Sequence, residues 1–427
     1  MKHICEDCIK NEELKQRLIL ENQNGDCSYC SGKYKKIISS DILIKFGGDR
    51  LINSLYSIEQ ATPYEVGMFF EGVDDINFQE IGYIIQDLQV GNEIFEDELA
   101  EYVFQTSDSK EDLFILDYGE HSNNTYKHKW LEFTQSTAHK HRFFNKEAKI
   151  FLDSLFELIL DDGKIRENVI TTLNNSTELF RARIANDEYT RKKIVFDPAS
   201  QLGPVPASLA GEQRMTPTGI SSLYCALERD TCFSEVRAIT GDIVFSGCFK
   251  PIDNLHFLDL TKIHTLSQLT VDPFSENFAD FSNKSEFIRD LMTLMSKPAS
   301  RNSSSSYLST QIIFEYLSVK FGNALSGLIF KSVQTDGKGT NVVLFPEHSQ
   351  IIPSGHSYKN IETAIESQYS FSKLTYYYSI SKDGSNSIPT INPKAKMKYV
   401  DGSLELYKVK AVVTSIENIP LEIVIHE

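Results

Sequence analysis

The spacing of apolar residues divides the chain into a helical first part and a mixed second part. In the first part, apolar residues recur at intervals of three and four positions, which is the repeat of one face of an α-helix. Residues 37–58, 95–105 and 145–163 show this repeat, whereas residues 107–124 mix a short apolar run with polar turn formers and predict a loop. The pattern therefore predicts a mainly helical region over residues 36–170.

After residue 170, short apolar runs alternate with segments of helical spacing. Runs rich in Val, Ile, Phe and Tyr predict strands, and the helical spacing predicts helices between them. The predicted strands are residues 193–196, 221–227, 241–249, 255–260, 326–333 and 341–345, with closing strands at 407–416 and 421–427. The predicted helices are residues 230–239, 285–296 and 308–321, and the serine-rich residues 296–308 predict a loop. The fold class expected is α+β, with a helical region followed by a mixed α/β domain.

Four of the seven cysteines lie within the first thirty residues. Cys5, Cys8, Cys27 and Cys30 form two C-x2-C pairs with eighteen residues between them. Each pair can place two thiolates on one turn, and two such turns complete a tetrahedral Zn²⁺ site of the structural kind. So short a segment buries too little surface to fold on a core of its own, and metal binding would replace that core. We predict structural Zn²⁺ in residues 1–35; four free thiols or a redox pair are the alternative.

Length and charge limit the kinds of partner. A chain of 427 residues exceeds what one hydrophobic core usually organises, so two or three domains are expected. A net charge of -16 argues against broad electrostatic capture of nucleic acid or of an anionic membrane. The N-terminus has no apolar signal-like run, and no apolar run is long enough to span a bilayer. We therefore expect a cytoplasmic protein that binds small molecules or proteins.

Four polar residues in the second half of the chain stand in segments with a recognisable order. They are Arg181 in LFRAR, Arg214 in QRMTPTG, Glu235 in TCFSEVRA and Ser332 in GLIFKSVQ. Their order, and the strand-like or helical pattern around each, resembles the RES domain, named for its Arg, Glu and Ser, over roughly residues 176–348. The resemblance implies a fold similar to that of ADP-ribosyltransferases and an enzyme that consumes NAD⁺ at the bond between nicotinamide and ribose. Together with the zinc segment and the helical region, this resemblance gives three expected domains: residues 1–35, 36–170 and 171–427.

Cleavage of the bond between nicotinamide and ribose requires several kinds of group in the site. Nicotinamide leaves as a neutral molecule, so the site needs a carboxylate near the ribose, cations for the pyrophosphate and a clamp for the nicotinamide ring. We place Glu235 early in its helix as the carboxylate. Arg183 lies on the same strand face as Arg181 and competes with it for the phosphate role. The resemblance assigns Arg181, Glu235 and Ser332 as catalytic, and Arg214, Tyr224, Asn341 and Gln311 as substrate-binding.

The helical region offers no catalytic residue of its own. It resembles the helical region fused to some RES domains and grouped with HEPN proteins, but no histidine has the arginine five positions before it that active HEPN ribonucleases carry. The cluster His139, His141 and Arg142 could bind an anion or a metal. We favour a solvated helix start there, ahead of buried Phe143 and Phe144.

These features predict a cytoplasmic NAD⁺-degrading enzyme, a glycohydrolase or phosphorylase that acts as a toxin or defence effector. NAD⁺ is the expected substrate, an antitoxin or regulatory protein the expected partner, and neither membrane nor nucleic acid is expected. One alternative is an ADP-ribosyltransferase that modifies a protein or a nucleic acid. The other is a module that binds RNA or a partner through its N-terminal part and carries an inactive RES domain.

Overall fold

The computed structural model describes residues 2–72, 77–119, 121, 125–266, 271–296, 307–352, 358–364, 377–382 and 394–412. The chain forms two compact units, and each unit draws on separated segments. Unit 1 comprises Met1–Gln135, Asp153–Leu158 and His264–Leu291, and unit 2 comprises Ser136–Leu152, Ile159–Ile263 and Met292–Glu427. The domain boundaries expected at residues 35 and 170 do not coincide with these limits and stay predictions.

Unit 1 combines short antiparallel strands with helices. Its three-stranded sheet has the order β1-β3-β2, and a separate ribbon pairs β4 with β5. The strands are β1 (His3–Cys5), β2 (Gln23–Gly25), β3 (Lys35–Ser39), β4 (Leu55–Ser57) and β5 (Phe114–Leu116). The helices are η1 (Glu6–Cys8), α1 (Glu12–Glu21), α2 (Ser40–Ile52), α3 (Pro63–Phe70), α4 (Ile81–Asp87) and α5 (Glu93–Thr106). The helices predicted within 37–58 and 95–105 are confirmed, and β5 lies inside the predicted loop.

One hydrophobic core joins the cysteine-bearing segment of unit 1 to the helices that follow it. Ile4, Leu14, Leu43 and Phe95 are fully buried in this core. Gly91, between α4 and α5, has no room for a side chain, since an added Cβ would lie 2.2 Å from the carbonyl oxygen of Cys8. The first thirty residues therefore fold against α2, α4 and α5 and share their core.

Three further helices contribute to both units: α6 (Thr125–His139), α7 (Lys146–Phe156) and α11 (Phe278–Ser296). The helices predicted within 145–163 and 285–296 are thus confirmed. No helix among the described residues is long and apolar enough to cross a membrane.

The turn between α6 and α7 exposes two phenylalanines. Phe143 is 76% exposed and Phe144 is 102% exposed, so their predicted burial is wrong. The helix begins only after them: Asn145 Oδ1 accepts a hydrogen bond from the backbone N–H of Ala148 at 3.0 Å, and Asn145 Nδ2 donates to Ser136 Oγ at 3.1 Å. Because Asn145 caps α7, both rings precede the apolar face of the helix.

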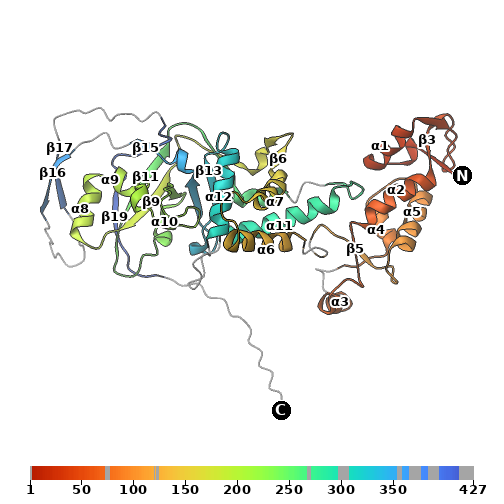
Figure 1. The fold of residues 1–427 in the computed structure, drawn as a ribbon, viewed down its shortest axis with the longest axis horizontal. Coiled ribbons are helices and arrows are strands. Elements are labelled where there is room, and N and C mark those ends of the chain that lie inside the picture. The colour runs from red at the N-terminus through yellow and green to blue at the C-terminus, as the bar shows by residue number, and fades with distance from the viewer. Residues whose placement is uncertain are drawn as a thin grey trace, which may run out of the picture. The chain divides into compact units, whose positions relative to one another are not determined.

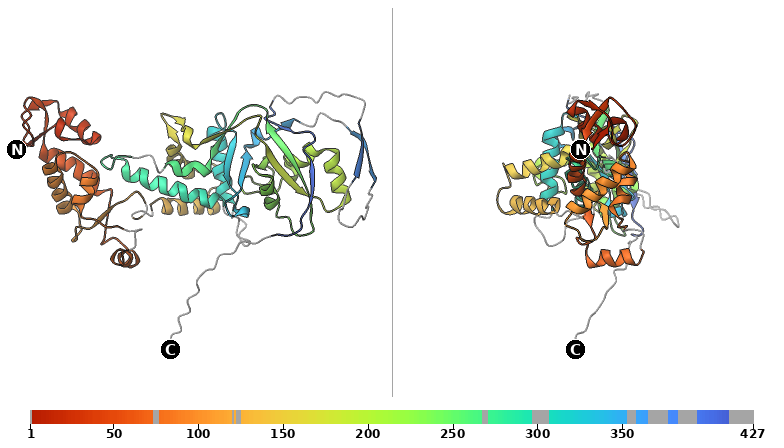
Figure 2. Two further views of the ribbon diagram at one scale, coloured as in Figure 1. Left: turned by 180° about the vertical axis from the view of Figure 1, so that it is seen from behind. Right: turned by 90° about the vertical axis from the view of Figure 1, so that its right-hand side faces the viewer.

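Unit 2 is built on a ten-stranded, mainly antiparallel sheet. Its strand order is β15-β18-β11-β9-β10-β14-β13-β12-β8, and β19 also pairs with β11. The strands are β8 (Ile170–Leu173), β9 (Leu179–Ile184), β10 (Tyr224–Ala226), β11 (Ile243–Pro251), β12 (Leu255–Asp259), β13 (Gly327–Lys331), β14 (Thr340–Leu344), β15 (Ile351–Ile352), β18 (Met397–Tyr399) and β19 (Glu405–Lys408). Small hairpins pair β6 (Leu160–Asp161) with β7 (Lys164–Ile165), and β16 (Tyr358–Ala364) with β17 (Tyr377–Lys382), the latter beside α8 in Figure 2.

The remaining helices of unit 2 are short, apart from α12. They are α8 (Glu188–Phe196), α9 (Pro198–Leu202), α10 (Arg229–Glu235), α12 (Leu308–Phe321) and the single turns η3 (Glu167–Val169), η4 (Ala207–Leu209), η6 (Val333–Thr335) and η7 (Pro346–His348). The 3₁₀ helices η2 (Glu157–Ile159) and η5 (Leu260–Leu266) contribute to both units. Helix α9 contacts β9 and β11, and α10 packs on β9 and β10 (Figure 1). The centre of the sheet is apolar, with Phe249, Phe257 and Leu344 fully buried.

Most predicted strands and helices of unit 2 are confirmed, with two exceptions. The closing strand predicted at 407–416 coincides with β19 only over residues 407–408, and residues 409–412 are not part of a strand. The predicted strand 193–196 is instead the end of α8. Asp187 caps this helix by accepting a hydrogen bond from the N–H of Thr190 at 2.8 Å, and Ile194 is its only buried residue. Asp187 lies six positions before this apolar run and caps the helix that contains it, so the run is helical. Residues 297–306 and 413–427, where a loop and the last strand are predicted, lie outside the described residues.

Candidate active site

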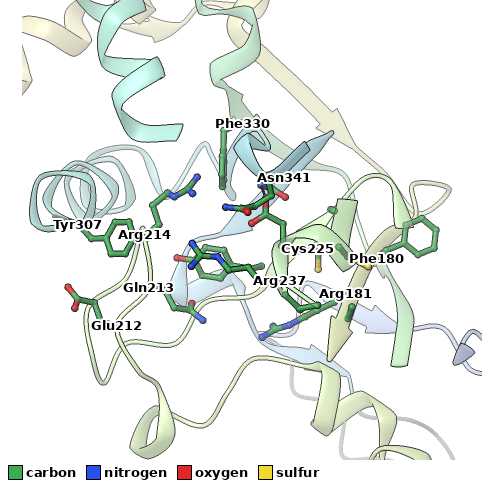
Figure 3. Close-up of a pocket in the computed structure, with 17 residues that line it drawn as sticks. Phe180, Arg181, Glu212, Gln213, Arg214, Cys225, Arg237, Tyr307, Phe330 and Asn341 are labelled. Carbon is green, nitrogen blue, oxygen red and sulfur yellow. Dashed lines mark hydrogen bonds between the residues drawn. The ribbon is translucent and has the colours of Figure 1, made fainter. Parts of the chain in front are cut away.

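A cavity of about 460 Å³ opens in unit 2 where β9, β10, β13 and β14 meet α10. Residues far apart in the sequence line it, because the strand order brings their strands together. Figure 3 shows the labelled side chains around it. The cavity is lined by Phe180, Arg181, Ala182, Glu212, Gln213, Arg214, Tyr224, Cys225, Ala226, Cys232, Glu235, Val236, Arg237, Tyr307, Phe330, Gln334 and Asn341.

A half-buried carboxylate, that of Glu235, lies in this cavity in a fixed orientation. Ser332 Oγ donates a hydrogen bond to Glu235 Oε1 at 2.5 Å, and Asn341 Nδ2 donates to the same oxygen at 2.7 Å. Among the described residues, no hydrogen bond reaches the second oxygen, Oε2. The carboxylate is therefore held by one oxygen and offers the other to a ligand.

Helix α10 places Glu235 by ending there. The predicted position early in a helix is wrong, since Glu235 is the last residue of α10 and Arg237 turns the chain with φ +51°. The helix is fixed at its start as well: Glu228 Oε2 accepts hydrogen bonds from Thr231 Oγ1 at 2.9 Å and from the N–H of Thr340 at 2.8 Å. These contacts tie α10 to the start of β14.

The turn between β13 and β14 comes unusually close to α10. An added Cβ on Gly339 would lie 2.1 Å from Thr231 Oγ1, so only glycine fits at this contact. The backbone of Gly339 accepts a hydrogen bond from the N–H of Ser332 at 2.8 Å. This close approach brings Ser332 and Asn341 within hydrogen-bonding distance of Glu235.

Three guanidinium groups reach the cavity from three different segments. Arg181 lies on β9, Arg214 on the loop before β10, and Arg237 just after α10 (Figure 3). Within the described structure, none of the three forms a hydrogen bond or an ion pair through its side chain, and Arg181 Nη1 is fully buried without a partner. Burial lowers the pKa of Arg181 from its usual value. Guanidinium groups with all donors unused form a site for an anion.

Arg183, the competitor of Arg181, has a different role. Its Nη1 donates to the side-chain oxygen of Gln201 at 2.8 Å and to the backbone oxygen of Gln201 at 3.2 Å. Arg183 is exposed and does not line the cavity. The structure therefore places Arg181, and not Arg183, beside Tyr224 and Cys225.

The loop that carries Arg214 is held from behind by α12. Thr310 Oγ1 donates to the backbone oxygen of Arg214 at 2.6 Å, and Gln311 Nε2 donates to the backbone oxygen of Gln213 at 2.9 Å. Gln311 is buried and does not line the cavity, so it fixes the loop instead of facing a ligand. Tyr224 does both, since its ring lines the cavity and its hydroxyl oxygen accepts from the N–H of Met215 at 3.1 Å.

The aromatic and thiol groups of the cavity are neutral at ordinary pH. Burial raises the pKa of Tyr224 to about 12 and that of Cys225 to about 12. Burial also raises the pKa of Cys232 to about 11. A buried thiol that stays protonated is a poor nucleophile, so we assign these cysteines to packing.

Two prominent residues of the cavity escaped the sequence analysis. Phe330 reads as an ordinary core residue of its strand, and its ring lies 5.9 Å from the guanidinium carbon of Arg214. Arg237 follows Glu235 by two positions, a spacing at which an ordinary ion pair between them would be unremarkable. Among the described residues no such pair exists. Arg237 adopts a left-handed backbone conformation at a position without glycine or asparagine, the residues that usually mark such a turn in a sequence.

The four clustered cysteines meet at one point in unit 1. Their sulfur atoms all lie within 4.8 Å of one another, with Cys5–Cys8 at 3.8 Å, Cys5–Cys30 at 3.6 Å and Cys8–Cys27 at 3.8 Å. A tetrahedron with metal–sulfur bonds of about 2.3 Å has sulfur–sulfur edges of about 3.8 Å. The four thiols therefore fit a metal ion, and they are the only such group among the described residues; His139 and His141 belong to none.

Residues 178–360 match the family model of the RES domain. This is less than half of the chain, and it covers the lining residues from Arg181 to Asn341. No curated protein matches the chain.

Proposed function

We propose that the chain is an NAD⁺-degrading enzyme that cleaves the bond between nicotinamide and ribose, as a glycohydrolase or phosphorylase. The match to the RES domain, a family generally linked to NAD⁺-related toxin activity, supports the substrate. The observation that carries the proposal is the cavity itself. Unpaired guanidinium groups surround a carboxylate with one free oxygen, and NAD⁺ combines an anionic diphosphate with a positively charged nicotinamide ring.

The arginines bind and orient the diphosphate in this proposal. A guanidinium forms two parallel hydrogen bonds to a phosphate, which fixes direction as well as distance. Arg181 has a buried Nη1 without a partner, so a phosphate oxygen would satisfy a donor that is costly to leave unpaired. Arg214 supplies the second cation from a loop that α12 holds in place.

Glu235 stabilises the charge that develops on the ribose. As the bond breaks, its electron pair leaves with nicotinamide, which becomes neutral, and the positive charge moves to the ribose. The free Oε2 faces this charge while Ser332 and Asn341 hold Oε1. An oxygen of water or of phosphate then bonds to the ribose carbon and releases a proton. The products are nicotinamide and either ADP-ribose or its 1-phosphate.

For unit 1, we propose that a bound metal ion has a structural role. We assign Zn²⁺ to Cys5, Cys8, Cys27 and Cys30, since four thiolates at tetrahedral spacing leave no open position for a reacting water. We further propose a similarity of the RES-like part to ADP-ribosyltransferases in fold, and a role of the whole chain as a toxin or defence effector with an antitoxin or regulatory protein as partner.

Product analysis tests the proposed function directly. Purified protein is incubated with NAD⁺, with and without inorganic phosphate, and the products are separated and identified. Release of nicotinamide together with ADP-ribose supports a glycohydrolase, and the 1-phosphate supports a phosphorylase. ADP-ribose attached to a macromolecule would assign the chain to ADP-ribosyl transfer instead. If folded protein releases no nicotinamide, the proposal is wrong.

A further inference from the structure

Three guanidinium groups and two carboxylates, those of Glu235 and Glu212, line the cavity, and Glu212 accepts a hydrogen bond from Gln311 Nε2 at 3.3 Å instead of pairing with an arginine. The diphosphate of NAD⁺ carries one negative charge on each phosphate, and Arg181 and Arg214 match these two charges. Glu235 matches the positive nicotinamide. Arg237 is then a third guanidinium in the cavity with no counterpart on NAD⁺.

The protein does not neutralise Arg237 either. In the part of the chain that the structure describes, no carboxylate lies within ion-pairing distance of it, although Glu235 is only two residues away. Glu235 Oε1 is engaged by Ser332 and Asn341. An unpaired guanidinium beside two others is electrostatically unfavourable until an anion arrives, so the arrangement favours a ligand with a further negative group.

The backbone directs Arg237 to this place. Its φ of +51° lies in the left-handed region, which non-glycine residues seldom adopt and which is often found at functional sites. Arg237 is also the most exposed of the three arginines, whereas Arg181 has a covered Nη1. The third cation thus lies toward solvent, where the outer part of a bound dinucleotide, or a small anion entering the cavity, would meet it.

We propose that Arg237 binds a third phosphate group, in addition to the diphosphate of the substrate. This group has two sources with the same chemistry. It is either a phosphate on the adenosine ribose, as in NADP⁺, or inorganic phosphate that enters as the acceptor. A phosphate monoester carries about -1.5 to -2 charges at neutral pH and three acceptor oxygens, which suits a guanidinium. The inference rests on the proposed function for the identity of the substrate.

Binding measurements test the proposal without catalysis. Affinities for ADP-ribose, for ADP-ribose 2′-phosphate and for inorganic phosphate are measured on the parent and on Arg237→Asn, since asparagine tolerates the left-handed backbone and removes the guanidinium. We expect the variant to lose about tenfold in affinity for one phosphate-bearing ligand, the 2′-phosphate or inorganic phosphate, and less than about twofold for ADP-ribose. The ligand that loses affinity identifies the source.

Arg183→Asn is the matched control, since Arg183 is exposed on β9 and lies outside the cavity. It should leave all three affinities unchanged. Equal loss of affinity for ADP-ribose and its 2′-phosphate in Arg237→Asn would place Arg237 on the diphosphate and overturn the proposal. Unchanged affinity for all three ligands would overturn it as well.

Turnover separates this proposal from the proposed function. Rates of nicotinamide release are measured with NAD⁺ and with NADP⁺, each with and without inorganic phosphate. If the parent cleaves NAD⁺ but Arg237→Asn alters neither the preference for NADP⁺ nor the effect of phosphate, only the third phosphate site fails. If the parent cleaves neither dinucleotide, the proposed function fails, and the binding result still decides whether Arg237 holds a phosphate.

Discussion

At the scale of single residues, the site depends on which polar atoms have partners and which do not. Glu235 is fixed by Ser332 and Asn341, about a hundred positions further along the chain. The guanidinium groups of Arg181, Arg214 and Arg237 have no hydrogen-bond or ion-pair partner in the part of the chain that the structure describes. One oxygen of Glu235 already has hydrogen-bond partners within the protein, whereas the arginine donors and the second oxygen of Glu235 are available to a ligand. We therefore expect the second oxygen of Glu235 to face the reacting group.

Replacing the carboxylate should remove catalysis and keep binding. Glu235→Gln keeps the size of the side chain and can still accept from Ser332, but it removes the negative charge. We expect the rate of NAD⁺ cleavage to fall by on the order of 100-fold, the effect of deleting one electrostatic stabiliser, with little change in NAD⁺ affinity. Steady-state kinetics and binding measurements check both parts.

Glu315→Gln is the control for this variant, because Glu315 is exposed on α12 and does not line the cavity. It should cleave NAD⁺ at the parental rate. A folded Glu235→Gln protein with parental activity would exclude Glu235 from the mechanism. Glu228, which is bonded to Thr231 and Thr340, would then be the next acid to examine.

Burial of neutral groups in the cavity predicts sensitivity to alkaline pH. The pKa of Cys225 is about 12 in the folded chain, above the ordinary value of 9.0, and that of Tyr224 is also about 12, above 10.0. The unfolded chain loses these protons first, so their contribution to stability is complete below pH 9.0 and is lost as the pH rises toward about 12. Denaturant unfolding at several pH values should show a declining free energy of unfolding. The decline should be shallower in Cys225→Ala; an equal slope in both proteins would contradict the assignment.

At the scale of elements, the contact between α10 and the β13–β14 turn positions the site. Gly339→Ala would bring a methyl group to 2.1 Å from Thr231 Oγ1 and push the two elements apart. We expect a loss of stability of about 1–3 kcal/mol. We also expect a loss of activity on the order of 100-fold, because small displacements of a catalytic group are costly. Thermal unfolding and kinetics measure the two effects.

Two further variants test whether the contact is the cause. Gly337→Ala lies in the same turn with φ +71° and meets nothing within 4 Å, so it should cost stability through backbone strain and leave the rate of cleavage nearly unchanged. Adding Thr231→Ala to Gly339→Ala removes the obstructing atoms and should restore part of the activity. If Gly337→Ala inactivates the enzyme as strongly as Gly339→Ala, the turn acts through something other than this contact.

The strands of the sheet could be predicted from sequence more reliably than the ends of the helices and the contacts between elements. Apolar runs identified β10 to β14 because these strands are buried on both faces. The end of α8 was mistaken for a strand, since its capping residue, Asp187, stands six positions before the apolar run. A helix start was predicted at His139, His141 and Arg142, but His139 ends α6, and Phe143 and Phe144 in the turn after it were wrongly predicted as buried.

The site itself could be predicted only in part. The residues that the family resemblance supplied line or support one cavity, but Arg237 and the close approach of Gly339 depend on the tertiary structure. A left-handed backbone at an arginine and a glycine chosen for a neighbour 108 positions away leave no local pattern. The roles of the lining residues stay predictions until they are tested.

At the scale of the whole molecule, the metal site and the cavity belong to different units. All lining residues of the cavity lie in unit 2, and the four clustered cysteines lie in unit 1. Cys5 and Cys8 also take part in the core that joins the first thirty residues to α2, α4 and α5. Loss of the metal should therefore act on the folding of unit 1.

Removing two ligands tests this separation. Cys27→Ser combined with Cys30→Ser should abolish the binding of about one zinc per chain and lower the thermal stability of unit 1, since metal binding supplies folding energy. NAD⁺ cleavage should remain at the parental level. Metal analysis and kinetics on the same preparation measure both, and full zinc retention by the double variant would refute the assignment.

The pairing of β11 has a consequence for how the chain can be divided. β9 covers one edge of β11, and β18 and β19, which lie beyond the residues that match the RES domain, cover the other. A fragment cut at residue 360 would leave nine residues of an apolar strand, Ile243–Pro251, with a bare row of N–H and C=O groups. Such an edge invites pairing between molecules and aggregation. The smallest soluble form of the RES-like part therefore has to extend through β19.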